Sequence, residues 1–182
     1  MGYISEIRKF VGHAPIMCCA AGAIILDKDN RILLQKRSDV NLWGNPGGAM
    51  ELGEDIEETL KREINEETGL QIINPEFFTI YSGEDEHLIY PNGDEVFYVN
   101  VVYIVREYTG DLTKDEESEE LKFFKMNEIP SNTTKTLKNI LNDLKTYNWK
   151  WRLFYKWNKF NNWVSKKRNW NKDIKRTIKQ KF

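Results

Sequence analysis

The chain has 182 residues, of which 40% are hydrophobic and 30% charged, and its 27 Lys and Arg nearly balance its 28 Asp and Glu. This composition excludes collagen-like, low-complexity and disulfide-scaffold proteins, and the length suits one domain of about 100–150 residues with an appendage. No apolar run approaches the roughly 18–20 residues of a membrane span, and the N-terminus lacks the apolar stretch of a signal peptide. The only cysteines, Cys18 and Cys19, are adjacent. In a strand they would point to opposite faces, so we expect a reduced, cytoplasmic protein.

Charge is distributed unevenly along the chain. Residues 1–146 contain 15 basic and 27 acidic residues, whereas residues 147–182 contain 12 basic residues, one acidic residue and five of the six tryptophans. We therefore predict an acidic domain over 1–146 and a basic, Trp-rich C-terminal extension over 147–182.

Hydrophobic periodicity in residues 1–146 predicts a mixed α/β domain. The apolar run 17–26 indicates a buried strand, and a polar turn separates it from a second strand at 31–35, so the two are predicted to form a hairpin. The glycine-rich segment 41–53 is expected to be a loop. The other predicted elements are a helix over 54–68 that ends at Gly69, strand-like segments over 71–81, 96–105 and 121–126, and a helix over 132–145.

The helix predicted over 54–68 carries acids where apolar residues belong. On a helical wheel Leu60 and Ile64 mark the buried stripe, Glu67 falls inside it, Glu63 lies at its edge and Glu66 follows beside them. Acids on a core-facing edge lose solvation and repel one another, and a bound cation would offset both effects. Oxygen ligands without His or Cys favour Mg²⁺, Mn²⁺ or Ca²⁺ over zinc, which suggests metal-assisted chemistry on a phosphate ester or anhydride.

The segment Gly48–Leu70 resembles the Nudix box, whose pattern is G-x5-E-x7-R-E-U-x-E-E-x-G-U with U aliphatic. Every specified position is filled, by Gly48, Glu54, Arg62, Glu63, Ile64, Glu66, Glu67, Gly69 and Leu70. The resemblance implies an α/β protein with the Nudix fold, a mixed β-sheet sandwiched between helices, here with a C-terminal basic aromatic helical extension. It also implies Mg²⁺- or Mn²⁺-dependent hydrolysis of a phosphoanhydride in a nucleoside diphosphate linked to another moiety.

The resemblance also assigns roles within the box. Glu63 and Glu67 would be the first metal ligands, Glu66 a third and catalytic as well, and the carbonyl of Gly48 a fourth. Arg62 would join the catalytic residues by pairing with Glu66 and orienting the acidic cluster.

Two further box positions are implied to be structural, and the general base is left open. Glu54 would hold the loop against the start of the helix, and Gly69 would end it. The base varies in the family between a box glutamate, here Glu63, and a glutamate on a later loop. The acidic run 115–120 lies where such a loop would be, with Glu117 as the first candidate there and a solvated acidic turn as the plain alternative.

Outside the box, three residues are candidates for substrate binding. Arg37 would contact phosphate or remain a surface arginine. Trp43 would stack on a base or pack against the box. Glu95 belongs to a turn over 90–95 that would shape the substrate pocket or serve only as a hairpin turn. This pattern does not identify the nucleotide.

The basic aromatic extension has three interpretations. It would pack as a helix on its own domain or on a homodimer partner, lie on an anionic membrane surface, or contact RNA. The last would favour an RNA 5′-end pyrophosphohydrolase. Other functions left open are a non-catalytic nucleotide-binding module and a prenyl diphosphate isomerase, which shares the fold.

Overall fold

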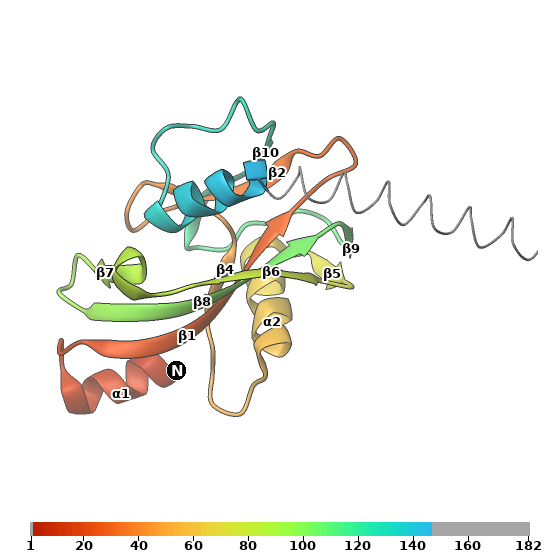
Figure 1. Ribbon diagram of the computed structural model, residues 1–182. Coiled ribbons are helices and arrows are strands. Elements are labelled where there is room, and N and C mark those ends of the chain that lie inside the picture. The colour runs from red at the N-terminus through yellow and green to blue at the C-terminus, as the bar shows by residue number, and fades with distance from the viewer. Residues whose placement is uncertain (1, 147–182) are drawn as a thin grey trace, which may run out of the picture. The chain divides into compact units, whose positions relative to one another are not determined.

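The computed structural model describes residues 2–146 (Figure 1). Contacts between residues divide the chain into two compact units, Met1–Lys138 and Asn139–Phe182. The predicted extension 147–182, with its helix and its proposed contacts, lies outside the described residues, so the boundary after residue 146 stays a prediction. No helix among the described residues is long and apolar enough to cross a membrane.

A mixed sheet forms the centre of the first unit. Its strands are β1 (Ile16–Ile25), β4 (Gly47–Ala49), β6 (Glu76–Tyr81), β7 (His87–Ile89) and β8 (Glu95–Val105), and the hydrogen-bonded order is β4-β1-β8-β6. β1 and β8 run parallel over their whole length, while β4, β6 and β7 pair antiparallel with their neighbours. Figure 1 shows β1 and β8 side by side as the two long strands of this sheet.

The predicted hairpin of the first two strands is wrong. β2 (Ile32–Arg37) instead pairs with β10 (Ser118–Phe124) and β3 (Trp43–Gly44) in a second sheet. β1 and β2 share the isolated bridge Leu26↔Ile32 beside their turn. β8 pairs along one edge of β1, and β4 pairs with the other edge only at Ala20–Gly22, so β1 and β2 diverge directly after the bridge at their turn.

Other boundaries also differ from the predictions. The segment 41–53 contains β3 and β4 as well as loop, and the strand predicted over 71–81 is divided into β5 (Gln71–Ile73), which pairs with β9 (Glu107–Thr109), and β6. Asn74, at the break, has a positive φ of 48°, which ends the strand. The helix predicted over 132–145 is observed over 135–146.

Two helical elements were not predicted, α1 (Tyr3–Val11) and the short 3₁₀ helix η1 (Gly83–Glu86). α1 buries none of its residues, although Ile4, Ile7 and Val11 form an apolar stripe at helical spacing that could have marked it in the sequence. Cys18 and Cys19 are both free, with Cys18 buried and Cys19 exposed, as expected for neighbours on opposite faces of β1.

The helix α2 (Ile56–Thr68) has defined ends and a buried face. The side chain of Asp55 accepts hydrogen bonds from the backbone N–H groups of Glu57 and Glu58, and Gly69 ends the helix in the left-handed conformation, with φ of 73°. Leu60 and Ile64 are fully buried in a cluster to which β1 contributes small and aliphatic side chains. The predicted stripe therefore fixes which face of α2 turns towards β1.

We expect Asp55→Ala to lower the free energy of unfolding by about 1 kcal/mol, because two N–H groups of the first helical turn lose their acceptor. Urea unfolding followed by circular dichroism would measure the loss. The control is Lys61→Ala on the exposed face of the same helix, expected to change stability by less than about 0.5 kcal/mol. Equal losses in the two variants would show that the cap contributes nothing.

Candidate active site

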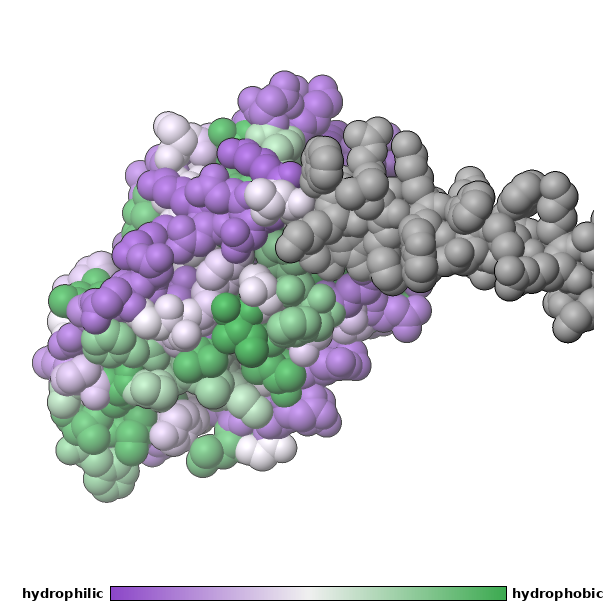
Figure 2. All heavy atoms as spheres, in the orientation of Figure 1, coloured by the Kyte–Doolittle hydropathy of each residue, from purple (hydrophilic) through white to green (hydrophobic). Residues whose placement is uncertain are grey.

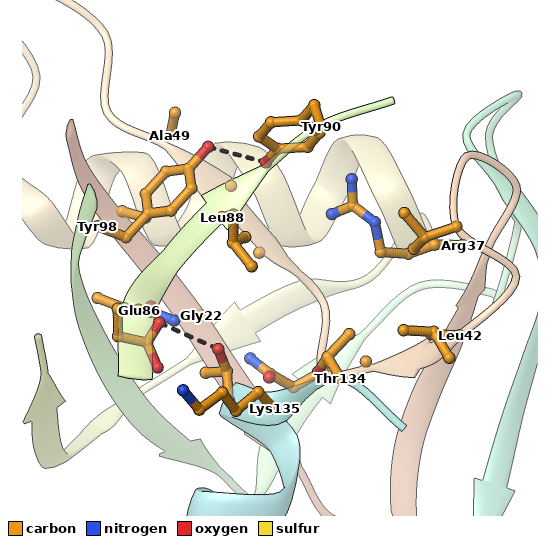
Figure 3. Close-up of a pocket in the computed structure, with 18 of the residues that line it drawn as sticks. Gly22, Arg37, Leu42, Ala49, Glu86, Leu88, Tyr90, Tyr98, Thr134 and Lys135 are labelled. Atoms are coloured by element: carbon orange, nitrogen blue, oxygen red, sulfur yellow. Dashed lines mark hydrogen bonds between the residues drawn. The ribbon is translucent and has the colours of Figure 1, made fainter. Parts of the chain in front are cut away.

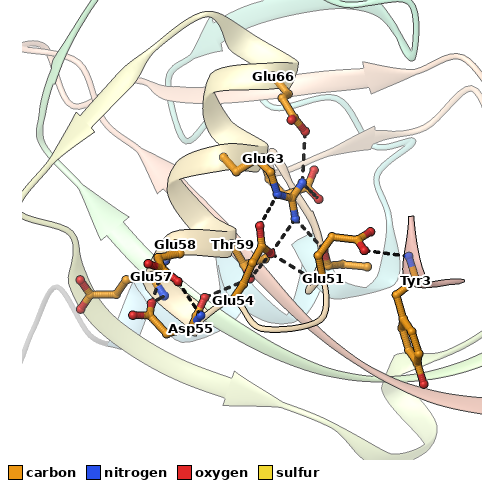
Figure 4. A network of polar contacts seen from close by, with 11 residues as sticks. Tyr3, Glu51, Glu54, Asp55, Glu57, Glu58, Thr59, Glu63 and Glu66 are labelled. Carbon is orange, nitrogen blue, oxygen red and sulfur yellow. Dashed lines mark hydrogen bonds and ion pairs between the residues drawn. The ribbon is translucent and has the colours of Figure 1, made fainter. Parts of the chain in front are cut away.

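Arg62 joins the box loop to the acidic face of α2. Its Nε and Nη2 donate to the two carboxylate oxygens of Glu54 at 2.6 and 2.9 Å, and Nη2 also donates to the carbonyl of Ala49 at 3.0 Å. Its Nη1 donates to Glu63 at 2.7 Å and Glu66 at 3.1 Å. In Figure 4 the labelled side chains of Glu54, Glu63 and Glu66 meet at this one guanidinium.

Glu54 holds the loop against the start of the helix. One of its oxygens accepts from the backbone N–H of Glu51 at 3.0 Å and from the hydroxyl of Thr59 at 2.9 Å. Hydrogen bonding to Arg62 is the largest influence on this carboxyl and lowers the pKa of Glu54 to about 2. Glu54 is therefore ionised in the folded protein throughout the neutral range.

Within the cluster Glu67 is buried and Glu63 is half-buried. Glu67 is only 6% exposed, and its carboxylate accepts from the backbone N–H of Gly47 at 2.7 Å. Burial raises the pKa of Glu67 to about 7 and also raises the pKa of Glu63. The side chain of Glu66 is 58% exposed, so the three acids span the range from core to solvent.

The donor set fits a hard divalent cation. A Cβ built on Gly48 would lie 2.5 Å from the carboxylate of Glu63, so the missing side chain of Gly48 makes the space in which this carboxylate meets the backbone of β4. Within residues 2–146, no three His, Cys, Asp or Glu side chains converge as a preformed metal site. Glu63 and Glu66 instead bind Arg62, and a cation would have to compete with it for their oxygens.

A cavity of about 350 Å³ opens beside Gly47 and Gly48. Figure 3 shows the hydroxyl groups of Tyr90 and Tyr98 in contact along one side, where their oxygens lie 3.0 Å apart. A side chain at Gly47 would collide with the backbone of β1, so glycine is required for β4 to lie this close.

The three residues predicted to bind substrate lie in different environments. They are Arg37, Trp43 and Glu95. Arg37 lines the cavity, and its guanidinium is paired with Asp39. Burial raises the pKa of Glu67, and the charge of Arg37 partly opposes this by lowering it. Trp43 is buried and packs edge-on against Phe124, with ring centroids 4.9 Å apart. Glu95 pairs with His87 at 2.8 Å and is not among the described residues that line the cavity.

Glu117 lies on the other side of Arg37. It lines a smaller hollow with Gln35, Arg37, Ser38 and Asp39. Its side chain is exposed, and its charge contributes to the raised pKa of Glu63, although burial is the larger cause. Glu117 is thus near the acidic cluster in space although 54 positions separate it from Glu63.

Several cavity residues were not singled out from the sequence. Glu86, Tyr98 and Asn100 all line the cavity. Glu86 lies in a short acidic run that resembles an exposed turn, and only its burial in the structure distinguishes it from Glu84 and Asp85. The alternating pattern of a half-buried strand could have marked Tyr98 and Asn100 as sharing one face of β8.

We expect Glu54→Gln to flatten the acid side of the stability profile. Because folding lowers the pKa of Glu54 from 4.5 to about 2, the contribution of its ion pair is complete above pH 4.5 and is lost as the pH falls towards 2. Urea unfolding between pH 7 and pH 2 should show the variant less stable at pH 7, with the difference shrinking at low pH. Glu57→Gln, on the exposed face of α2, should give a curve parallel to the wild type. A constant difference for Glu54→Gln would contradict the linkage.

Comparisons with known proteins agree with this geometry. The family model described as the NUDIX domain matches residues 19–144. An ADP-ribose pyrophosphatase of Methanocaldococcus jannaschii is 37% identical over 109 residues, which cover 58% of this chain and 61% of that protein. The match to the second curated relative covers 65% of its length, so this chain spans less than two thirds of both.

Solved structures show the same fold. A MutT NUDIX hydrolase from Burkholderia pseudomallei superposes with a TM-score of 0.60 at 28% identity, covering 70% of this chain and 97% of that one. A MutT protein from Bacillus halodurans gives a TM-score of 0.54 at 31% identity, covering 68% and 82%. The family model, the complete box and the mixed sheet around β1 and β8 with α2 against it together show that the chain belongs to the Nudix family.

Proposed function

We propose that the protein is a metal-dependent pyrophosphohydrolase that cleaves a phosphoanhydride of a nucleoside diphosphate linked to another moiety. The observation that carries this proposal is the placement of Glu63 beside Gly48 and of Glu67 beside Gly47, on one helix and next to a cavity that Arg37 lines. A non-catalytic binding module would not require both Glu63 and Glu67 on the core-facing edge of one helix, because their desolvation and mutual repulsion are unfavourable without a cation.

Different residues would bind the metal, orient its carboxylate ligands and accept the proton. Glu63, Glu66, Glu67 and the Gly48 carbonyl would hold Mg²⁺ or Mn²⁺, which when bound neutralises charge on a diphosphate and makes water more acidic. Arg62 keeps the acids oriented while the site forms.

The remaining residues act on the substrate and on the attacking water. Arg37 faces the cavity and would neutralise a phosphate oxygen there. Glu117, exposed and close enough to influence Glu63, would accept the proton of the attacking water.

The names of the relatives support the same class of substrate. The Methanocaldococcus relative is named for ADP-ribose, a nucleoside diphosphate linked to a sugar. Another curated relative, from Xenopus laevis, is named "nucleoside diphosphate-linked moiety X motif 6" and is 36% identical over 81 residues. Both names place the second group on the far side of a diphosphate, which agrees with a cavity that lies beside the acidic cluster.

The direct test is a panel of nucleotides incubated with the full chain and Mg²⁺ or Mn²⁺, with products separated by chromatography. The panel would contain ADP-ribose, sugar nucleotides, dinucleoside polyphosphates, NADH, nucleoside triphosphates and 5′-triphosphate RNA, with EDTA controls. Metal-dependent cleavage at a phosphoanhydride would support the proposal. Tight nucleotide binding without turnover of any member would favour the binding module.

We expect Glu67→Gln to lower kcat at least about a hundredfold, because the variant loses a charged ligand while keeping the shape that fills the space beside Gly47. Steady-state kinetics in Mg²⁺ and in Mn²⁺ would measure the loss, and circular dichroism would check the fold. Glu57→Gln, on the exposed face of the same helix, should retain full activity. Wild-type activity in Glu67→Gln would remove this residue from the metal site.

Glu117→Gln tests the general base separately. If Glu117 takes the proton, kcat should fall about a hundredfold with little change in KM, and the acid limb of the pH–rate profile should shift. Glu116→Gln, one residue away and also exposed, should behave like the wild type. The same small effect in both variants would return the role of base to Glu63.

A further inference from the structure

Glu86 is a buried acid that the hydrolytic chemistry does not use. It lies at the end of η1, it is 2% exposed, and one carboxylate oxygen, Oε2, accepts from the hydroxyl of Thr136 at 3.0 Å. The other oxygen, Oε1, is buried and has no hydrogen-bond partner among the described residues. The amide of Asn100 lies close enough to favour the charged form, but it does not complete a hydrogen bond to Oε1.

A half-satisfied buried carboxyl is unfavourable for folding. A buried acceptor without a donor loses its hydrogen bonds to water without replacement. Burial is also the main reason that the pKa of Glu86 is raised. An acid kept only for structure would be expected to have both oxygens paired. A ligand in the cavity that brings an N–H group would supply the missing donor.

The position of Glu86 shows which part of a ligand it would meet. Figure 3 shows Glu86 and Arg37 on opposite sides of the cavity. Arg37 lines the side of the cavity where its charge interacts with the charge of Glu67 in the acidic cluster. The phosphates would therefore lie on the Arg37 side. Glu86 would therefore face the group farthest from the diphosphate. The tyrosine pair and Leu88 line the space between them, which suits a flat ring.

An ionised carboxylate only accepts hydrogen bonds, which restricts the ring edge that it can face. Guanine presents two adjacent donors, its ring N–H and its exocyclic amine. Adenine and cytosine place a ring acceptor beside their amine, and uracil places a carbonyl on each side of its ring N–H. Of these four bases, only guanine can therefore offer a pair of donors to one carboxylate. One donor would meet the unpartnered Oε1, and the other would meet the second lone pair of Oε2, whose first lone pair accepts from Thr136.

We propose that Glu86 is a specificity-determining residue that binds the donor edge of a guanine-type base, so that the preferred substrates are guanosine diphosphates linked to another group. This rests on the proposed function for the identity of the reaction, but nucleotide binding tests it without turnover. Asn100 and Thr136 position the carboxylate.

Isothermal titration of the full chain with GDP, ADP, UDP and CDP in EDTA would test base selection. We expect GDP to bind at least about tenfold more tightly than the other three, a difference of about 1.4 kcal/mol. Glu86→Gln should weaken GDP binding to the level of the others, since its amide nitrogen replaces one acceptor with a donor. Glu84→Gln, exposed on the same 3₁₀ helix, is the matched control and should keep the wild-type preference.

Three results would overturn the inference. The first is equal affinity of the wild type for the four nucleotides, and the second is an unchanged GDP preference in folded Glu86→Gln. The third is a uniform loss of affinity for all four nucleotides in Glu86→Gln, which would mean that Glu86 contacts the ribose or has only a structural role. Kinetics with GDP-linked and ADP-linked sugars in Mg²⁺ separate the two proposals. GDP preference without hydrolysis rejects the hydrolase and keeps base selection, whereas hydrolysis without preference rejects base selection alone.

Discussion

The arrangement of the acidic cluster depends on one guanidinium. Nε and Nη2 of Arg62 donate to both carboxylate oxygens of Glu54 and to the carbonyl of Ala49. Its third nitrogen, Nη1, therefore faces Glu63 and Glu66. The loop and helix α2 are thereby joined at the point where two like charges meet. An arginine suits this position because the five N–H donors of its planar fork reach four separate groups, whereas a lysine ammonium has only three donors at one point. Without that charge, the acids would be held close together with only repulsion between them.

Arg62 and a divalent cation are alternative partners for the same oxygens. In the structure Glu63 and Glu66 are turned towards the arginine, whereas Glu67 lies deeper, beside Gly47, with a raised pKa that reflects its burial. Binding a cation would favour the ionised form of Glu67 and draw Glu63 part of the way from Arg62. Arg62 therefore offsets part of the repulsion within the cluster, and Glu54 holds Arg62 in place.

Much of this site could be predicted because it depends on local periodicity. The spacing of Leu60, Ile64 and Glu67 placed an acid on the buried face of a helix, and the structure buries all three. The pairing of β1 could not be predicted in the same way, since an apolar strand carries no mark of its partners and both of its edges pair with distant segments. The helical spacing of Ile4, Ile7 and Val11 could have predicted α1, even though the helix buries none of its residues. Glu86 escaped prediction because acids in a short polar run usually face solvent, and its burial depends on Thr136, 50 positions later.

The residues proposed to hold the cation and those proposed to select the base lie in different parts of the site. The acids that would hold the cation come from a single helix whose ends are fixed by Asp55 and Gly69. The cavity, in contrast, is assembled from β1, β4, η1, β8 and the segment before the last helix, which are brought together only by the sheet. A change in η1 can therefore alter which base is accepted without moving the carboxylates of α2. The close approach of β4 to β1 at Gly47 connects the two regions, because the same backbone N–H that lies against the cavity also binds Glu67.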